Sequence, residues 1–330
     1  MGIVENKVSV IIPTYNAKNY IDRCVQSVLS QSYQNFELII VDDGSTDGTI
    51  NILENYETNY KDKIKIFKQK NSGVAVARNK GIELATGRYV MFIDNDDYID
   101  NDYIKMFVNE IMEYSFDIVM GGYRRPNSNG KIIEKVKLKQ NELSKVKITA
   151  PWAKIYDRMY LLKNNIKFLE CNIGDDVFFN LKAVTFTDKI RIMDYIGYNW
   201  YYNEKSVSNV AHRKMNDNLE FDYMLDSCYS IMNDNEYKKE NNKIMEFYFI
   251  KQITWYLVYS GKNADTSYIA EKMIFLNKWL SDKFPNFAKN EFIKFKVDSF
   301  KIIMAMKLIV FAMKSNNEKK FVKIYKMFYK

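Results

Sequence analysis

The stretch YVMFIDNDD, residues 89–97, joins five apolar residues to a cluster of acidic ones. A run of β-prone residues without polar interruption is typical of a strand that is buried on both faces of a parallel sheet. Residues that follow such a strand lie at the carboxyl edge of the sheet, where open α/β folds bind their ligands. The sequence therefore predicts three carboxylates, those of Asp94, Asp96 and Asp97, at a ligand-binding edge.

Asp94 and Asp96 are two residues apart where the chain leaves the predicted strand. Their carboxylates can turn toward one hard cation, and a divalent ion held by one or two carboxylates usually completes its shell with substrate phosphates. A second interpretation is an acidic turn that begins a helix at Asp100 and Asn101, because both residue types cap helices. The tetrapeptide alone does not choose between a metal–diphosphate site and a cap.

Three earlier segments repeat the pattern of a buried strand followed by a helix. The predicted strands are Val8–Ile12, Phe36–Val41 and Ile64–Phe67, and the predicted helices lie at 20–29, 50–56 and 74–85. Strand starts that are about 25–28 residues apart leave room for one strand and one crossover helix, which predicts a mainly parallel sheet with right-handed connections. This layout is an α/β fold of the Rossmann-like, nucleotide-binding type.

The loops that follow these strands carry residues suited to a nucleotide. After the first strand come Pro13 and Tyr15, whose ring can lie flat against a base. After the second comes Asp43, whose carboxylate can accept the imide N–H of uracil, and after the third comes Arg78, which can pair with phosphate or base. Each loop also has an ordinary interpretation: a helix-entry turn, an Asx-type turn and a solvated surface charge.

Other phosphate-binding motifs are missing from the sequence. No Gly-x-Gly-x-x-Gly follows the first predicted strand and no Gly-Lys-Ser/Thr loop occurs, which disfavours dinucleotide redox enzymes and P-loop hydrolases. In order and spacing, the four loops together resemble those of glycosyltransferase family 2, whose members are inverting enzymes with the GT-A fold. The matching segments are Val8–Asn16, Val41–Asp47, Asn71–Gly81 and Phe92–Asp97.

This resemblance implies roles for residues on the donor side. The implied nucleotide-sugar-binding residues are Pro13, Tyr15, Asp43, Arg78, Asp94 and Asn95. Asp96, with Asp94, would hold Mn²⁺ or Mg²⁺ between the two phosphates, and Asp97 would support the loop. The chemistry is reasonable without the family, because a metal neutralises the charge that develops on a departing nucleoside diphosphate.

Inversion at a sugar carbon requires a base that removes the proton of the acceptor hydroxyl, and one carboxylate suffices. The segment Gly174–Phe179 resembles the family motif Glu-Asp-x-x-Phe, which places the catalytic base at Asp176. Asp175 stands where the family has Glu, so the side chain reaches less far. The alternative is a carboxylate pair that is stabilised by the dipole of a helix N-terminus.

On the acceptor side the resemblance implies Trp152 and Lys154, together with Asp175. The segment PWAKIY, residues 151–156, matches a Trp-x-Lys segment of the family. Trp152 also fits an ordinary core position, and Lys154 could instead meet a phosphate. His212, the only histidine of the chain, is either a late metal ligand or a surface residue, and the sequence does not decide.

Length and charge divide the chain into two parts. A chain of 330 residues is long enough for two domains, and we expect a catalytic domain at 1–215 and a helical domain at 216–330. The net charge of +8 is concentrated in 289–330, which holds eleven lysines and three carboxylates. This segment suits a helix on an anionic membrane surface, or an amphipathic helix that packs in its own domain or in a homo-oligomer. A basic tail on a neutral body does not predict a nucleic-acid groove.

The sequence shows no signal peptide and no apolar run long enough to span a bilayer. We therefore expect a cytoplasmic protein, with 289–330 as the segment that can reach the inner face of the cell membrane. Cys24, Cys171 and Cys228 are widely spaced and indicate neither a disulfide framework nor a zinc site.

The sequence leads to the hypothesis of a metal-dependent inverting glycosyltransferase that moves a sugar from a UDP-sugar to a saccharide hydroxyl. The acceptor would be a glycan, a lipid-linked saccharide or a surface-polymer precursor. Two other classes stay open: a sugar nucleotidyltransferase, which would need a Gly-rich basic loop after the first strand, and a non-catalytic binding module with a basic tail. No motif identifies the donor sugar, the acceptor or the linkage.

Overall fold

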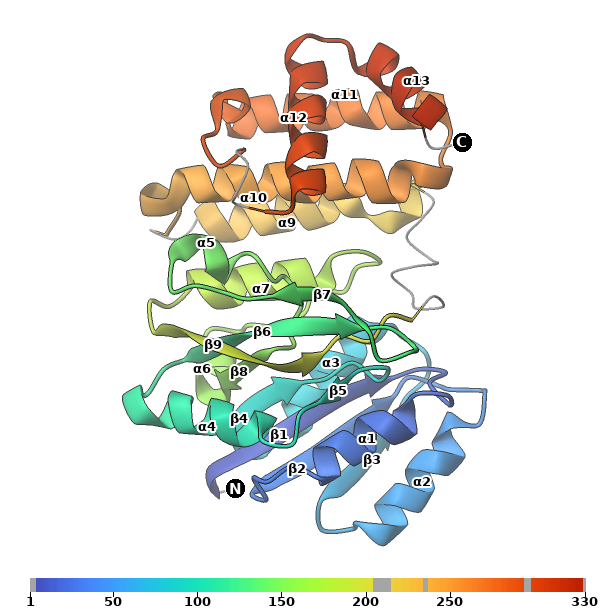
Figure 1. Cartoon of the computed structure of the whole chain (residues 1–330), viewed down its shortest axis with the longest axis vertical. Coiled ribbons are helices and arrows are strands. Elements are labelled where there is room, and N and C mark those ends of the chain that lie inside the picture. The colour runs from blue at the N-terminus through green and yellow to red at the C-terminus, as the bar shows by residue number, and fades with distance from the viewer. Residues whose placement is uncertain (1–3, 204–214, 234–236, 294–297, 329–330) are drawn as a thin grey trace. The chain divides into compact units, whose positions relative to one another are not determined.

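The computed structural model describes residues 4–203, 215–233, 237–293 and 298–328. The chain divides into two compact units, Met1–Asn203 and Glu204–Lys330 (Figure 1). The first unit contains the sheet, and the described part of the second is helical. The boundary predicted at residue 215 falls a little later than this division.

The first unit is built on a nine-stranded sheet. Its strands are β1 (Val4–Thr14), β2 (Phe36–Asp42), β3 (Ile64–Lys68), β4 (Gly87–Phe92), β5 (Tyr98–Ile99), β6 (Ile118–Pro126), β7 (Ile132–Val136), β8 (Lys154–Asp157) and β9 (Ile190–Asn199). Their order across the sheet is β3-β2-β1-β4-β8-β6-β9-β5, and β7 pairs with β6 beside this path.

The first four strands form the parallel part of the sheet, as predicted. β1 pairs with β2 and β4, and β2 pairs with β3, all in parallel. The crossover helices α1 (Ile21–Leu29) and α2 (Thr49–Asn59) cover one face, and α3 (Val74–Leu84) covers the other (Figure 1). Every residue of β2 is buried, which explains why its apolar residues do not alternate with exposed polar ones.

β5 and β8 make the remaining sheet mixed. β8 pairs antiparallel with both β4 and β6, and the two-residue β5 pairs antiparallel with the end of β9. Because β5 follows the acidic loop directly, the next helix, α4 (Tyr103–Tyr114), begins only at Tyr103. The acidic loop 94–97 therefore leads into a strand, and the interpretation of a helix that begins at Asp100 is wrong. The smaller helices are α5 (Glu142–Lys145), α6 (Arg158–Lys163) and α7 (Asp175–Thr185).

The ends of β1 and β6 lie within segments that contain proline or polar residues. β1 continues past Pro13 to Thr14, because its ladder with β4 ends at Ile11 and Pro13 loses no hydrogen bond there. In the polar segment 124–130, β6 extends as far as Pro126, and residues 127–130 form the turn into β7. Arg124 stays in the strand, where its Nε donates to Asn199 Oδ1 of β9 at 2.7 Å.

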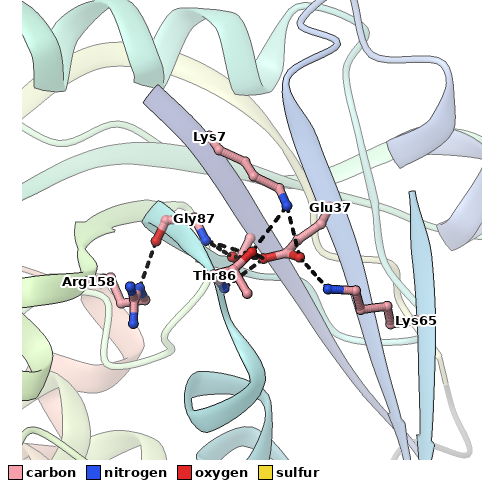
Figure 2. Close-up of polar contacts among 7 residues, drawn as sticks. Lys7, Glu37, Lys65, Thr86, Gly87 and Arg158 are labelled. Carbon is pink, nitrogen blue, oxygen red and sulfur yellow. Dashed lines mark hydrogen bonds and ion pairs between the residues drawn. The ribbon is translucent and has the colours of Figure 1, made fainter. Parts of the chain in front are cut away.

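A buried carboxylate joins the amino-terminal ends of three parallel strands (Figure 2). Glu37 Oε1 of β2 accepts from the Ser9 hydroxyl of β1 and from the Thr86 backbone N–H before β4, both at 2.7 Å. The ammonium groups of Lys7 and Lys65 lie 3.1 Å and 3.0 Å from Oε2. Burial opposes ionisation, but these donors lower the pKa of Glu37 to about 2, so the carboxylate is charged at neutral pH.

The described part of the second unit is helical, as the sequence predicted for the C-terminal part of the chain. Its helices are α9 (Phe221–Asn233), α10 (Tyr237–Tyr259), α11 (Thr266–Lys283), α12 (Phe300–Lys314) and α13 (Glu318–Phe328). Aromatic side chains fill its core: Phe221 stacks on Tyr256 at 3.8 Å, and Phe249 lies 5.3 Å from Trp279 between ring centroids. None of the helices that the structure describes is long and apolar enough to cross a membrane.

Candidate active site

The loops after β1 and β2 interlock at the carboxyl edge of the sheet. The Asn16 backbone N–H donates to Ser45 Oγ at 2.9 Å, and the Asn16 side chain accepts from the Thr46 N–H at 2.8 Å. Tyr15 lies in this loop and is 45% exposed, so its side chain is accessible to a ligand. Pro13 is buried within β1. Of these two predicted donor-binding residues, the structure leaves only Tyr15 open at the surface.

Asp43 anchors the loop that leads into α3. Its Oδ1 accepts from Gln69 Nε2 and the Ser72 N–H, and its Oδ2 accepts from the Gly73 N–H, each at 2.8 Å. A carboxylate offers about four lone-pair positions, so these three bonds leave capacity for one more donor such as a base imide. The structure thus gives Asp43 a structural task, and its contact with a nucleobase stays a prediction.

Asp97 is the buried residue of the acidic loop 94–97. Its side chain is fully buried and accepts from the Tyr198 hydroxyl at 2.6 Å and from the Tyr201 N–H at 2.8 Å. The same Tyr198 oxygen accepts from the Asp94 N–H at 3.2 Å. β9 and the residues after it therefore hold the loop that carries Asp94 and Asp96.

Asp96 lies at the centre of a second network. Its Oδ2 accepts from Asn203 Nδ2 at 3.0 Å, and its carbonyl accepts from Arg23 Nη2 at 2.7 Å. The guanidinium of Arg23 in turn lies 4.6 Å from the ring of Tyr98 and 4.0 Å from that of Tyr201. Burial raises the pKa of Asp96, so a nearby cation would stabilise its ionised form.

Arg78 connects the two acidic centres of the site. Its guanidinium is buried, with Nη2 at 2.8 Å from Asp94 Oδ1 and Nη1 at 2.8 Å from Asp175 Oδ2. These bonds bring the loop after β4 and the first turn of α7 to the same place, although about 80 residues separate them. Arg78 was expected to contact a base or diphosphate; in this structure both ends of its guanidinium bind carboxylates.

Asp175 and Asp176 open α7 directly after Gly174, which has a left-handed φ of 78°. Asp176 Oδ1 accepts from the Val177 N–H at 2.8 Å. Burial and the charge of Asp175 raise the pKa of Asp176 to about 6, although Arg78 opposes the rise. Burial also raises the pKa of Asp175. A carboxylate that titrates near neutral pH is well matched to general-base catalysis.

The two other residues expected on the acceptor side are buried. Trp152 stacks on Tyr198 with ring centroids 4.6 Å apart and planes 6° from parallel. The Lys154 ammonium donates to the carbonyls of Ile148 at 3.0 Å and Ala150 at 2.5 Å, and burial lowers its pKa to about 7. Both side chains pack inside the first unit, and their contact with an acceptor stays a prediction.

Residues 9–210 match the family model for glycosyl transferase family 2. The chain belongs to glycosyltransferase family 2. The protein is therefore an enzyme of the glycosyltransferase class, and an inverting mechanism is typical of this family. Family membership decides against the sugar nucleotidyltransferase and the non-catalytic binding module.

Relatives of known sequence agree with this assignment. The chain is 32% identical to the uncharacterized glycosyltransferase YibD of Escherichia coli over 66% of this chain and 67% of YibD. It is 30% identical to glycosyltransferase GlyA of Streptococcus pneumoniae over 64% of this chain. The poly(ribitol-phosphate) beta-glucosyltransferase of Bacillus spizizenii is 31% identical over 59% of this chain. The matched part spans only 33% of GlyA and 32% of the glucosyltransferase.

Solved structures show the same fold. S. aureus TarS 1-349 in complex with UDP superposes with a TM-score of 0.69 at 20% identity, covering 98% of this chain and 91% of that chain. The mannosyltransferase PcManGT of Pyrobaculum calidifontis, in complex with GDP-Man and Mn²⁺, gives 0.57 at 15% identity, covering 94% and 86%. The first unit of this glycosyltransferase thus has the predicted GT-A fold.

Asp94 and Asp96 are the family-2 residues that fit a divalent cation. They contribute hard carboxylate oxygens from one loop, and the charge of Asp94 adds to the burial that raises the pKa of Asp96. Among the described residues, no three His, Cys, Asp or Glu side chains are grouped as a metal site. Two carboxylates are nevertheless enough for an ion that takes its other ligands from a diphosphate. His212 lies outside the described residues.

Sequence reasoning missed three residues that hold the acidic loop of this glycosyltransferase: Arg23, Tyr198 and Asn203. Each acts from an element far from residues 94–97 in the chain, and each contacts a backbone group or carboxylate of that loop. Tyr198 lies in β9, and its contact with Asp97 could not be read from the spacing of residues in the sequence. No local signal distinguishes Arg23 or Asn203 from ordinary surface residues.

Proposed function

We propose that this enzyme transfers a sugar from a UDP-sugar to a saccharide hydroxyl, with inversion at the sugar carbon and with Mn²⁺ or Mg²⁺ as cofactor. The bridge from Asp94 through Arg78 to Asp175 carries the proposal. This bridge holds the loop 94–97, which we expect to bind the diphosphate, next to the start of α7, which carries the proposed base. A sugar donor and an acceptor bound side by side could therefore contact both. Direct transfer requires this proximity, because the acceptor oxygen must approach the carbon from which the diphosphate leaves.

On the donor side, Tyr15 offers an exposed ring to the base, and Asp43 has capacity for the imide N–H. Asp94 and Asn95 would contact the ribose and the donor sugar, and Asp96 would hold the metal. When bound, the metal would neutralise the charge that develops on the leaving diphosphate. Arg78 keeps Asp94 in place during this step, because its guanidinium fixes one carboxylate oxygen.

On the acceptor side, Asp176 would remove the proton of the attacking hydroxyl. With a pKa of about 6, its carboxylate is mostly ionised at neutral pH and is basic enough to accept a proton as the bond forms. Asp175 is bound to Arg78, so it would position α7 while Asp176 reacts. The shorter Asp in place of the family's Glu suits this bridge, since its oxygen lies 2.8 Å from the guanidinium.

The acceptor that we propose is a glycan or a lipid-linked precursor of a surface polymer. The names of two relatives support this proposal. One is the poly(ribitol-phosphate) beta-glucosyltransferase of Bacillus spizizenii, and the other is the putative teichuronic acid biosynthesis glycosyltransferase TuaG of Bacillus subtilis. We place the reaction in the cytoplasm, where thiols stay reduced. The three cysteines, all in described parts of the chain, form no disulfide. Residues 1–215 would carry out catalysis, and 216–330 would contact a membrane or a second copy.

Two substitutions test the proposed roles separately. Asp176→Asn should lower the transfer rate by about 10²–10⁴, the usual contribution of a general base, while UDP affinity stays within about twofold of wild type. Asp96→Ala should weaken UDP binding in the presence of Mn²⁺ by about ten- to a hundredfold, since a contact to a charged group is worth about 1.5–3 kcal/mol. Calorimetric titration with UDP and a product assay with candidate UDP-sugars measure the two effects.

The matched control is Asp194→Asn on β9, which removes the carboxylate of an exposed ion pair with Lys137. It should change neither quantity. Full transfer activity in Asp176→Asn would refute its role as base, and Mn²⁺-dependent UDP binding that survives in Asp96→Ala would refute the metal assignment.

A further inference from the structure

A lysine-bordered apolar stripe runs along α12 of the helical unit. Phe300, Met304, Leu308 and Phe311 recur every three or four residues and therefore share one face of the helix. Leu308 is 51% exposed and Phe311 71% exposed. The other side of the helix faces the core of the unit; its buried residues are Ile303, Met306, Ile309, Val310, Ala312 and Met313. Large apolar side chains aligned at the surface of one helix indicate a contact surface.

Positive charge borders this stripe on both sides. At 100° per residue, Lys301 lies along one edge of the stripe and Lys307 and Lys314 lie along the other. α13 adds further exposed lysines, which are Lys319, Lys320 and Lys323. Lysines of this kind can extend their charged ends beyond an apolar face that is buried next to them.

Two carboxylates next to α12 form contacts within the unit. Asp298 pairs with Lys251 at 2.7 Å, with only 11% of its side chain exposed. Glu318 is buried and accepts from Asn277 Nδ2 at 2.7 Å. The exposed lysines around this helix are Lys301, Lys314, Lys319, Lys320 and Lys323, and their charge can reach an anionic surface.

We propose that this face of α12 docks on an anionic lipid bilayer. The apolar stripe would enter the boundary between headgroups and acyl chains, and the lysines would lie at the level of the lipid phosphates. Charge favours this partner over a second copy of the chain, because a two-fold interface would bring the same lysines of both copies together. The inference goes beyond sugar transfer and depends on neither the donor nor the base.

Vesicle sedimentation with the full chain tests the proposal. The wild type should bind vesicles of phosphatidylcholine and phosphatidylglycerol, and much less those of phosphatidylcholine alone. The double variant Leu308→Ser/Phe311→Ser should bind the anionic vesicles about tenfold more weakly or worse, since two apolar side chains no longer enter the lipid. Lys301→Glu/Lys314→Glu should also lose binding, and added salt should weaken the wild type.

The matched control is Met106→Ser/Met112→Ser, which removes two exposed apolar side chains from α4 of the first unit and should bind as wild type does. If the Leu308/Phe311 double variant bound anionic vesicles as strongly as the wild type, the proposal would be overturned. The same holds if the wild type did not bind anionic vesicles at all. A wild-type oligomer that this variant converts to monomer would instead assign the stripe to a copy-to-copy interface. Transfer to a water-soluble acceptor should be unchanged in the variant, so failure of the proposed reaction would be seen separately.

Discussion

At the scale of single residues, the candidate base owes its properties to two neighbours and to burial. Burial and Asp175 make the ionised form of Asp176 less favourable, and Arg78 partly restores it. The balance gives a carboxylate that is basic for its type and still ionised at neutral pH. The same balance has a cost, because a carboxyl group whose pKa rises on folding destabilises the fold once it is ionised.

Asp176→Asn should therefore stabilise the enzyme while it removes activity. The folded pKa of about 6 lies above the ordinary value of 3.8, so stability is lost as the pH rises through this window. Above about pH 7 the variant should gain at most about 3 kcal/mol in free energy of unfolding, and below about pH 4 the gain should vanish. Chemical denaturation of both proteins at the two pH values measures the difference.

The control at this scale is again Asp194→Asn, whose carboxylate is exposed and should give no gain of this size. An Asp176→Asn variant that is less stable than wild type at both pH values would show that the carboxylate serves the fold.

At the scale of elements, Glu37 ties β1, β2 and the start of β4 together (Figure 2). Its pKa is lowered from 4.5 to about 2, so its contribution is present above about pH 4.5 and is lost as the pH falls toward 2. Glu37→Gln should cost about 2–4 kcal/mol of unfolding free energy at neutral pH, because the amide leaves Lys7 and Lys65 without their charge partner. The cost should shrink in acid, as thermal unfolding across this range would show.

Glu54→Gln provides the comparison, since Glu54 forms an exposed ion pair with Lys68 on the same unit. Its loss should change stability by less than about 1 kcal/mol. An equal effect of the two substitutions would mean that burial of Glu37 adds nothing.

The sequence predicts the elements well where consecutive strands are joined by a single crossover helix. β1 to β4 are apolar runs at regular spacing, and both their direction and the acidic edge follow from that pattern. β8 was not predicted, because its four residues pair with β4 and β6, which lie far from it in the chain. The same reason applies within the site: Asp43 and Asp96 could be nominated from their loops, but the bridge made by Arg78 depends on a contact with Asp175 that no local spacing encodes.

At the scale of the whole molecule, the residues proposed to bind the donor and the helical unit belong to separate compact parts of the chain. All the residues proposed to contact the nucleotide sugar lie between Pro13 and Asn95, within the first part. The family match also ends at residue 210, before the described helices α9 to α13 begin. The helical unit therefore lies beyond the part of the chain that the family model matches.

Hydrogen exchange of the full chain with and without UDP and Mn²⁺ tests this division of labour. Ligand binding stabilises the native state in proportion to occupancy, and loops that it orders should exchange more slowly. We expect protection in the loops around Tyr15, Asp43 and Asp94–Asp97, and exchange in 237–293 that is the same with and without ligand. Asp96→Ala at the same ligand concentrations is the control and should lose the protection in all three loops together. Comparable protection across 237–293 would contradict a donor site built from the first unit alone, because the helices would then share in binding the nucleotide.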